Sequence, residues 1–181
     1  PMKFLAIACL AFLIALATAI PPPAMADTEM PPTDYMKETE NGAYVFVMLA
    51  PDWRPYTAKD PGLRRTYKSS GLYAKGSKEP LWQVYWYSFT VYPSSDGKHV
   101  VRMGPWAQST NDLAIAFSEN GKDLKLYNIS DLVKDTNRLK HTVSHFFWRT
   151  DLKYNDKEGT ISLKTVDGIT YTFSVTTGEI I

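Results

Sequence analysis

Two histidines four residues apart, His141 and His145, have the spacing in this chain that most resembles a metal site. On a helix, the H-x₃-H spacing places both imidazoles on one face and can bind zinc. Here the surrounding sequence TVSHFFW is β-branched and aromatic, which predicts a strand. Residues four apart on a strand lie about 13 Å apart, at ~3.3 Å per residue, so the two rings could not share one ion. We therefore predict no metal site and expect these histidines beside aromatic rings.

Patterns that would indicate a known catalytic chemistry are missing from the sequence. Ser144 and His145 are adjacent, so on a strand they point to opposite faces and form no Ser–His pair. The chain has no G-x-S-x-G, H-E-x-x-H, P-loop or dinucleotide-binding pattern. Aspartates and glutamates are plentiful and fall mostly in expected turns. No two of them stand out as a catalytic pair, and a pair brought together by the fold stays an open alternative. We predict no cofactor and favour a non-enzymatic protein over the alternative, a secreted hydrolase acting on a polysaccharide with unidentified Asp/Glu acids.

The aromatic residues give the most specific candidate for a binding site. In the strand expected over residues 81–92 the odd-numbered face stays apolar along its length and is the expected core face. Trp82 and Trp86 then lie on the other, half-covered face. By the expected pairing with the next strand, Arg102 faces the same side, and Trp106 follows soon after.

We therefore predict a shallow platform of Trp82, Trp86, Arg102 and Trp106. Indole faces suit sugar rings or the apolar surface of a partner protein, and an arginine suits anionic groups. The alternative is that the same residues form a second small core covered by residues 51–80.

The first 26 residues have the order of a secretory signal peptide. Lys3 precedes the apolar run FLAIACLAFLIALATAI, three prolines follow, and Ala24-Met25-Ala26 is a small-x-small cleavage site. We expect cleavage after Ala26 and a periplasmic or extracellular protein with no membrane span thereafter. The alternatives are an uncleaved anchor, at the short limit for spanning a bilayer, and lipidation at Cys9.

Removing this segment changes the charge and the cysteine content. The whole chain has 20 Lys and Arg, 19 Asp and Glu and one cysteine. Residues 1–26 contain one base, Lys3, no acid, and the single cysteine, Cys9, so the remaining chain is formally neutral and free of thiols. The composition excludes a disulfide framework and a Cys-rich zinc site, and a neutral chain predicts no nucleic-acid partner.

The rest of the chain predicts one all-β domain over residues 43–181, after a flexible polar segment at 27–42. Expected strands are 43–49, 71–74, 81–92, 98–103, 113–117, 123–128, 144–150, 160–165 and 169–175. Turn pairs Asp96-Gly97, Asn120-Gly121 and Asp167-Gly168 fall between them. One short helical turn is expected at 129–134, capped by Ser130 or Asp131.

Matching apolar faces across each turn predicts the pairing of three hairpins. Ile161 and Leu163 are expected opposite Phe173 and Tyr171, with Gly168 closing a three-residue loop at positive φ. Two further sets are predicted in the same way: Phe89 and Val91 opposite Met103 and Val101, and Ile115 and Phe117 opposite Leu126 and Leu124.

The segments SSDGKHVV and FSENGKDLKLY, with the ending FSVTTGEII, resemble the S-x-D-G-K hairpins of bacterial β-propeller repeats. The stretches YPSSDGKHVVRMGPWA and HTVSHFFW are also similar to an exported bacterial family without assigned activity. The propeller resemblance implies meandering antiparallel hairpins. The two best matches begin only 24 residues apart, at Ser94 and Ser118, so no regular blade period is present.

The sequence thus predicts an antiparallel meander of propeller-like hairpins that forms a sandwich or partial propeller. A small closed β-barrel is the alternative fold. The predicted function is an exported, non-enzymatic binding or interaction module, with a carbohydrate or a cell-envelope protein as its ligand.

Overall fold

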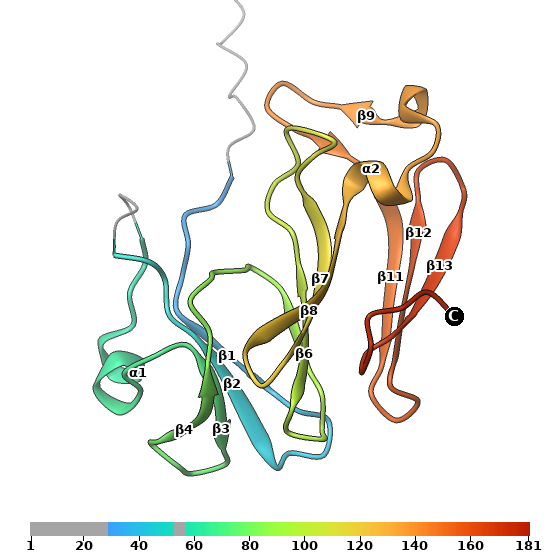
Figure 1. Cartoon of the computed structure of the whole chain (residues 1–181). Helices are drawn as coiled ribbons and strands as arrows, with labels where there is room; N and C mark the ends of the chain where they lie inside the picture. The colour runs from blue at the N-terminus through green and yellow to red at the C-terminus, as the bar shows by residue number, and fades with distance from the viewer. Residues whose placement is uncertain (1–28, 53–56) are drawn as a thin grey trace, which may run out of the picture.

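The computed structural model describes residues 29–52 and 57–181, and it consists mainly of β-strands (Figure 1). The expected signal peptide and its cleavage site lie outside the described residues. Within the described ranges, no helix is both long enough and apolar enough to cross a bilayer. The predicted all-β fold is confirmed, and the described strands form open sheets rather than a closed barrel.

Three larger sheets and one small hairpin make up the fold, and every sheet is an antiparallel meander. The first sheet contains β1 (Tyr35–Glu38), β2 (Tyr44–Met48), β3 (Gly71–Ala74) and β4 (Pro80–Gln83). The second contains β5 (Val91–Pro93), β6 (His99–Met103), β7 (Leu113–Glu119) and β8 (Lys122–Asn128). The third contains β11 (Arg149–Asn155), β12 (Thr160–Thr165) and β13 (Thr170–Ser174). The hairpin pairs β9 (Lys140–His141) with β10 (Phe146–Phe147).

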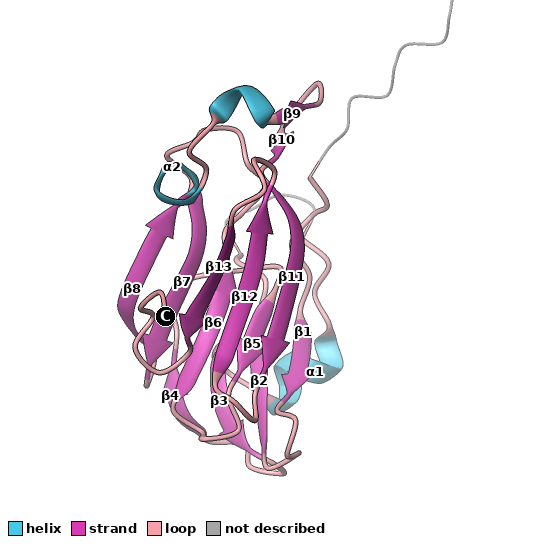
Figure 2. Cartoon of the chain, turned by 90° about the vertical axis from the view of Figure 1, so that its right-hand side faces the viewer, coloured by secondary structure: helices cyan, strands magenta, loops and turns pink. Residues whose placement is uncertain are grey.

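The three larger sheets stack face to face, with the second sheet in the middle (Figures 1 and 2). Its strand β6 is buried along its entire length. The side chain of Val100 packs toward the first sheet, in a cluster with Phe46 and Leu72. The next residue, Val101, packs toward the third sheet with Ile161. Side chains alternate between the two faces of a strand, so a strand that is covered on both faces must be apolar throughout.

Two short helices cover the ends of the stack. Helix α1 (Pro61–Thr66) begins with Asp60, whose carboxylate accepts hydrogen bonds from the backbone of Gly62 and Leu63. Leu63 packs on the outer face of the first sheet. Helix α2 (Ile129–Leu132) is the expected helical turn, and a 3₁₀ turn (Thr136–Arg138) follows it. The N-cap of α2 is Asn128, whose backbone N–H donates to the Asp131 carboxylate. Of the two residues expected to cap this helix, only Asp131 takes part.

The hairpin of β12 and β13 confirms the predicted pairing. Ile161 lies opposite Phe173 and Leu163 opposite Tyr171. Gly168 has φ of +92°, the left-handed conformation that this loop requires.

The other two predicted pairings are wrong by one residue. Val91 lies opposite Arg102 rather than Val101, and Ile115 lies opposite Tyr127 rather than Leu126. Bulges shift the register of the β7–β8 ladder between Leu113 and Ile115 and between Phe117 and Ser118. A bulge adds a residue to one strand and exchanges the faces beyond it. For that reason Leu124 and Leu126 are exposed instead of buried.

Four segments differ from their predicted organisation, and one of them is the expected strand over residues 144–150, which the structure divides between β10 and β11 in different sheets. The expected strand over residues 81–92 is two short strands, β4 and β5, in different sheets. The segment 27–42, expected to be flexible, contains β1, which pairs with β2. The segment 51–80, expected to be irregular apart from one short strand, also contains helix α1.

Candidate functional site

The structure brings three of the four predicted platform residues together between the first and second sheets, with Trp82 and Arg102 buried and Trp86 half-buried. Trp82 is 8% exposed, and its indole Nε1 donates to the carbonyl of Gly97 at 2.9 Å. Phe46 lies against both indoles, with ring centroids 5.7 Å from Trp82 and 6.0 Å from Trp86. Trp82, Trp86 and Arg102 thus form one group with Phe46, which we call the inter-sheet cluster.

Arg102 is the charged member of the inter-sheet cluster and is also 8% exposed. Its Cζ lies 4.4 Å from the centre of the Trp86 ring, and its Nη2 donates to Asp123 Oδ2 at 2.9 Å. Ser118 Oγ donates to the other oxygen of that carboxylate. Burial lowers the pKa of the Arg102 guanidinium, and the Asp123 carboxylate opposes that effect. The ion pair joins β6 to β8 within the second sheet, and the Trp86 ring, from the chain between β4 and β5, lies over the guanidinium.

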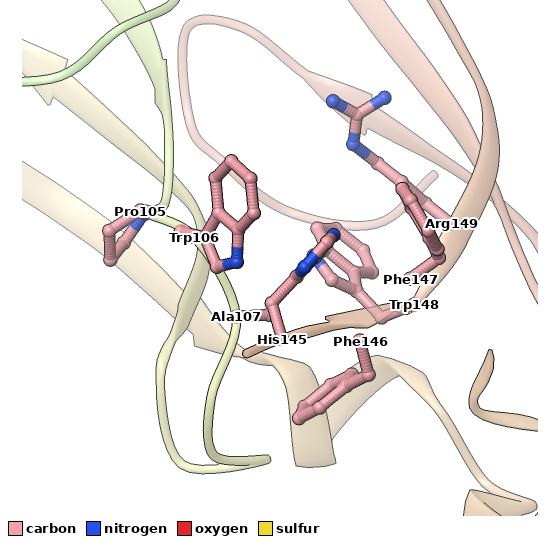
Figure 3. Close-up of a pocket in the computed structure, with 8 residues that line it drawn as sticks. All are labelled: Pro105, Trp106, Ala107, His145, Phe146, Phe147, Trp148 and Arg149. Atoms are coloured by element: carbon pink, nitrogen blue, oxygen red, sulfur yellow. The ribbon is translucent and has the colours of Figure 1, made fainter. Parts of the chain in front are cut away.

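Trp106, the fourth predicted residue, lies away from the inter-sheet cluster and lines a cleft of about 520 Å³. Other residues of the cleft come from the same loop and from the chain around β10 and β11 (Figure 3). The loop is held beside β10 by a hydrogen bond from the Phe146 N–H to the Ala107 carbonyl at 3.0 Å. It leaves β6 at Gly104, where a Cβ atom would lie 1.5 Å from the Leu113 carbonyl oxygen. Only glycine allows the chain to pass that close to β7.

Strict alternation along residues 145–149 builds the other wall of the cleft. Phe146 and Trp148 are buried, at 5% and 8% exposure, and belong to the core between the second and third sheets. The side chains between them, His145, Phe147 and Arg149, are partly or fully exposed. The backbone therefore anchors one face in the core and presents an imidazole, a phenyl ring and a guanidinium on the other.

The rings of this wall lie against one another and against Trp106. The His145 ring centroid is 4.1 Å from that of Trp106 and 4.8 Å from that of Phe147. Thr142 Oγ1 lies 2.7 Å from His145 Nδ1 and fixes the orientation of the imidazole. In Figure 3, Trp106 stands on one side of the opening and Arg149 on the other, with His145 between them. We call Trp106, His145, Phe147 and Arg149 the aromatic cleft.

The lining of the aromatic cleft carries positive or neutral side chains, and one carboxylate, Glu29, lies at its edge. Its lining contains Arg149 and His145 and no carboxylate among the described residues. Arg149 Cζ lies 5.9 Å from the Trp148 ring. Glu29 is at the edge of the loop, where its Oε1 accepts from the Trp106 backbone N–H at 3.2 Å. The Trp106 indole Nε1 has no hydrogen-bond acceptor in the part of the chain that the structure describes. The arrangement offers flat apolar rings beside a cation, which suits a ring-bearing ligand with an acceptor group.

The two histidines lie on a hairpin rather than on the single strand expected from the sequence. His141 is in β9 and pairs with Phe146, and residues 142–145 form the turn between β9 and β10. His145 does lie beside aromatic rings, as predicted. In the two described ranges, no three His, Cys, Asp or Glu side chains gather in a way that could hold a metal ion.

Sequence reasoning found Trp106 and missed the other three members of the aromatic cleft. The stretch HFFWR, residues 145–149, contains a usable signal: His145, Phe147 and Arg149 alternate with the large apolar residues Phe146 and Trp148. The sequence predicted one strand over residues 144–150, whereas the structure divides this segment between β10 and β11. The contact of this segment with the Trp106 loop also joins residues about 40 positions apart, which no local pattern marks.

Comparisons with protein-family models, with curated proteins and with solved structures gave no match, so the aromatic cleft is interpreted from its own geometry.

Proposed function

We propose that this chain is an exported, non-enzymatic binding module that holds a saccharide in the aromatic cleft. The observation that carries the proposal is the line of rings formed by Trp106, His145 and Phe147, next to Arg149. Sugar rings present apolar C–H faces that lie on aromatic side chains, and their hydroxyl groups need nearby hydrogen-bonding groups. The signal-peptide pattern of residues 1–26 supports a location in the periplasm or outside the cell.

The size of the cleft favours a small ligand over a protein partner. Its volume of about 520 Å³ lies within the usual range for small-molecule sites, ~300–1,000 Å³. A stable protein–protein interface needs about 800 Å² from each partner. A saccharide therefore fits this feature better than a cell-envelope protein does.

Binding is also better supported than hydrolysis at this site. Glycoside hydrolysis commonly uses two carboxyl groups about 5–10 Å apart on either side of the scissile bond. The described lining residues of the aromatic cleft supply none. The groups that they do supply are suited to holding a ligand.

We expect Trp106→Ala to weaken saccharide binding about 10-fold or more, because the substitution removes one wall of the cleft. A glycan array of neutral and acidic oligosaccharides identifies the bound saccharide, and calorimetric titration of that saccharide gives its affinity. The melting temperature should change by less than about 4 °C, since Trp106 is partly exposed and lies in a loop.

Trp82→Ala is the matched control, since it removes the same side chain from a buried position of the inter-sheet cluster. It should destabilise the chain by about 2 kcal/mol or more and leave the affinity unchanged at a temperature where the variant is folded. The proposal fails if no glycan binds to the wild-type chain, or if Trp106→Ala binds as tightly as wild type.

A further inference from the structure

We infer that the saccharide bound in the aromatic cleft is acidic, with a carboxylate that pairs with Arg149. This inference rests on the proposed function and adds to it the chemical class of the ligand. It follows from where the guanidinium lies, from the charges around it and from what a uronic acid presents.

Arg149 is placed to meet the charged end of a ligand whose ring lies on the aromatic wall. His145, Phe147 and Arg149 occupy alternate, outward-facing positions from the end of the turn through β10 to the start of β11, so an imidazole, a phenyl ring and a guanidinium form one span along the cleft wall. Trp106 closes this span at the His145 end. A sugar seated on the rings therefore directs a substituent toward Arg149, which stands across the opening from Trp106 (Figure 3).

The guanidinium has no carboxylate partner in the described chain. Arg64 and Arg102, by comparison, are paired with Asp34 and Asp123. Arg149 contacts the Trp148 ring and forms no ion pair with a described residue. The nearby Glu29 carboxylate accepts a hydrogen bond from the Trp106 backbone. A planar guanidinium in a half-open apolar cleft binds a carboxylate with two parallel hydrogen bonds more strongly than it would in open water.

An acidic sugar matches both halves of the site better than an acidic peptide does. A uronic acid carries its carboxylate on the pyranose ring, so one residue supplies a flat C–H face and a charge a few ångströms apart. An aspartate or glutamate side chain supplies the charge without a ring for Trp106, His145 and Phe147 to contact. The ring contacts thus select a saccharide and Arg149 selects its acidic form.

The test compares each acid with its own neutral form. Oligosaccharides of galacturonic acid and of glucuronic acid are titrated into the full chain, each also as the methyl ester, which keeps the sugar and removes the charge. At least one acid should bind about 10-fold more tightly than its ester at low ionic strength, and added salt should reduce the difference. Arg149→Gln should lower the affinity for the acid to that for the ester, with the affinity for the ester unchanged within about two-fold.

Lys153→Gln is the control variant, because Lys153 lies on the same strand, is exposed and carries the same charge. It should leave the ratio of acid to ester affinity unchanged. Equal affinity for acid and ester, with both lost in Trp106→Ala, would overturn the inference and leave the proposed function standing. Absence of binding by every oligosaccharide would overturn both. An oligoglutamate that binds as tightly as the uronates would show that charge alone is recognised, and this too would overturn the inference.

Discussion

Phe46→Ala is expected to lower the free energy of unfolding by about 3–5 kcal/mol, one of the largest effects for a single substitution in this chain. Phe46 is fully buried and contacts both Trp82 and Trp86, so truncation leaves a cavity beside the two indoles. The Trp86 ring also contacts the guanidinium of Arg102, so a shift of this ring would weaken that contact as well. The measurement is a denaturant titration of the variant and of wild type.

A control for this prediction comes from the same sheet. Leu81 is 54% exposed, and Leu81→Ala should change the free energy of unfolding by about 0.5 kcal/mol or less. In a chain of this size, the Phe46→Ala loss corresponds to a melting temperature lower by about 6–20 °C. Similar losses for Phe46→Ala and Leu81→Ala would show that the inter-sheet cluster is not a core.

Asp34→Ala is expected to cost about 3–5 kcal/mol at neutral pH, because it leaves a partly buried guanidinium with only the exposed carboxylate of Asp52, at 3.4 Å, as a counter-charge. The Asp34 side chain is fully buried, and Arg64 donates to both of its oxygens, at 2.7 and 2.9 Å. The backbone N–H groups of Ala50 and Asp60 donate to the same carboxylate. One side chain thus ties the start of β1, the end of β2 and the cap of α1 together.

The loss caused by Asp34→Ala should shrink as the pH falls. Burial by itself raises the pKa of Asp34, but the hydrogen bonds from Arg64 and from the two N–H groups outweigh it, so the pKa lies below the ordinary value of 3.8. A carboxyl group with a lowered pKa stabilises the folded chain above its unfolded pKa and loses that contribution as the pH drops through its folded pKa. Stability curves of wild type and variant should therefore converge below about pH 4. A difference that stays constant down to pH 2 would contradict the ionised pairing.

The turns were predictable from sequence because their chemistry is local. Gly168 must take a left-handed conformation after Asp167, and it does so in the hairpin whose pairing was predicted. The pairing of β7 with β8 was not predictable, because bulges add residues that no apolar pattern marks. Burial on both faces of β6 also hides the alternation on which such predictions depend.

The candidate site was only partly predictable, for a related reason. The sequence singled out the indoles as candidate binding residues, but their sequence positions do not say which sheet faces which. Trp82 and Arg102 became interior once the chain between β4 and β5 crossed from the first sheet to the second. Trp106 stayed at the surface because the strand that meets its loop buries Phe146 and Trp148 and turns His145 outward.

The central claim is that ligands bind at the aromatic cleft and not at the inter-sheet cluster. Indole N–H correlation spectra of isotope-labelled protein, recorded while an oligogalacturonate is added, test it directly. The Trp106 signal, assigned with the Trp106→Ala variant, should shift with the ligand concentration. The Trp82 signal, whose N–H is bonded to the Gly97 carbonyl, should stay in place. Shifts at Trp82 and Trp86 with no change at Trp106 would contradict the account.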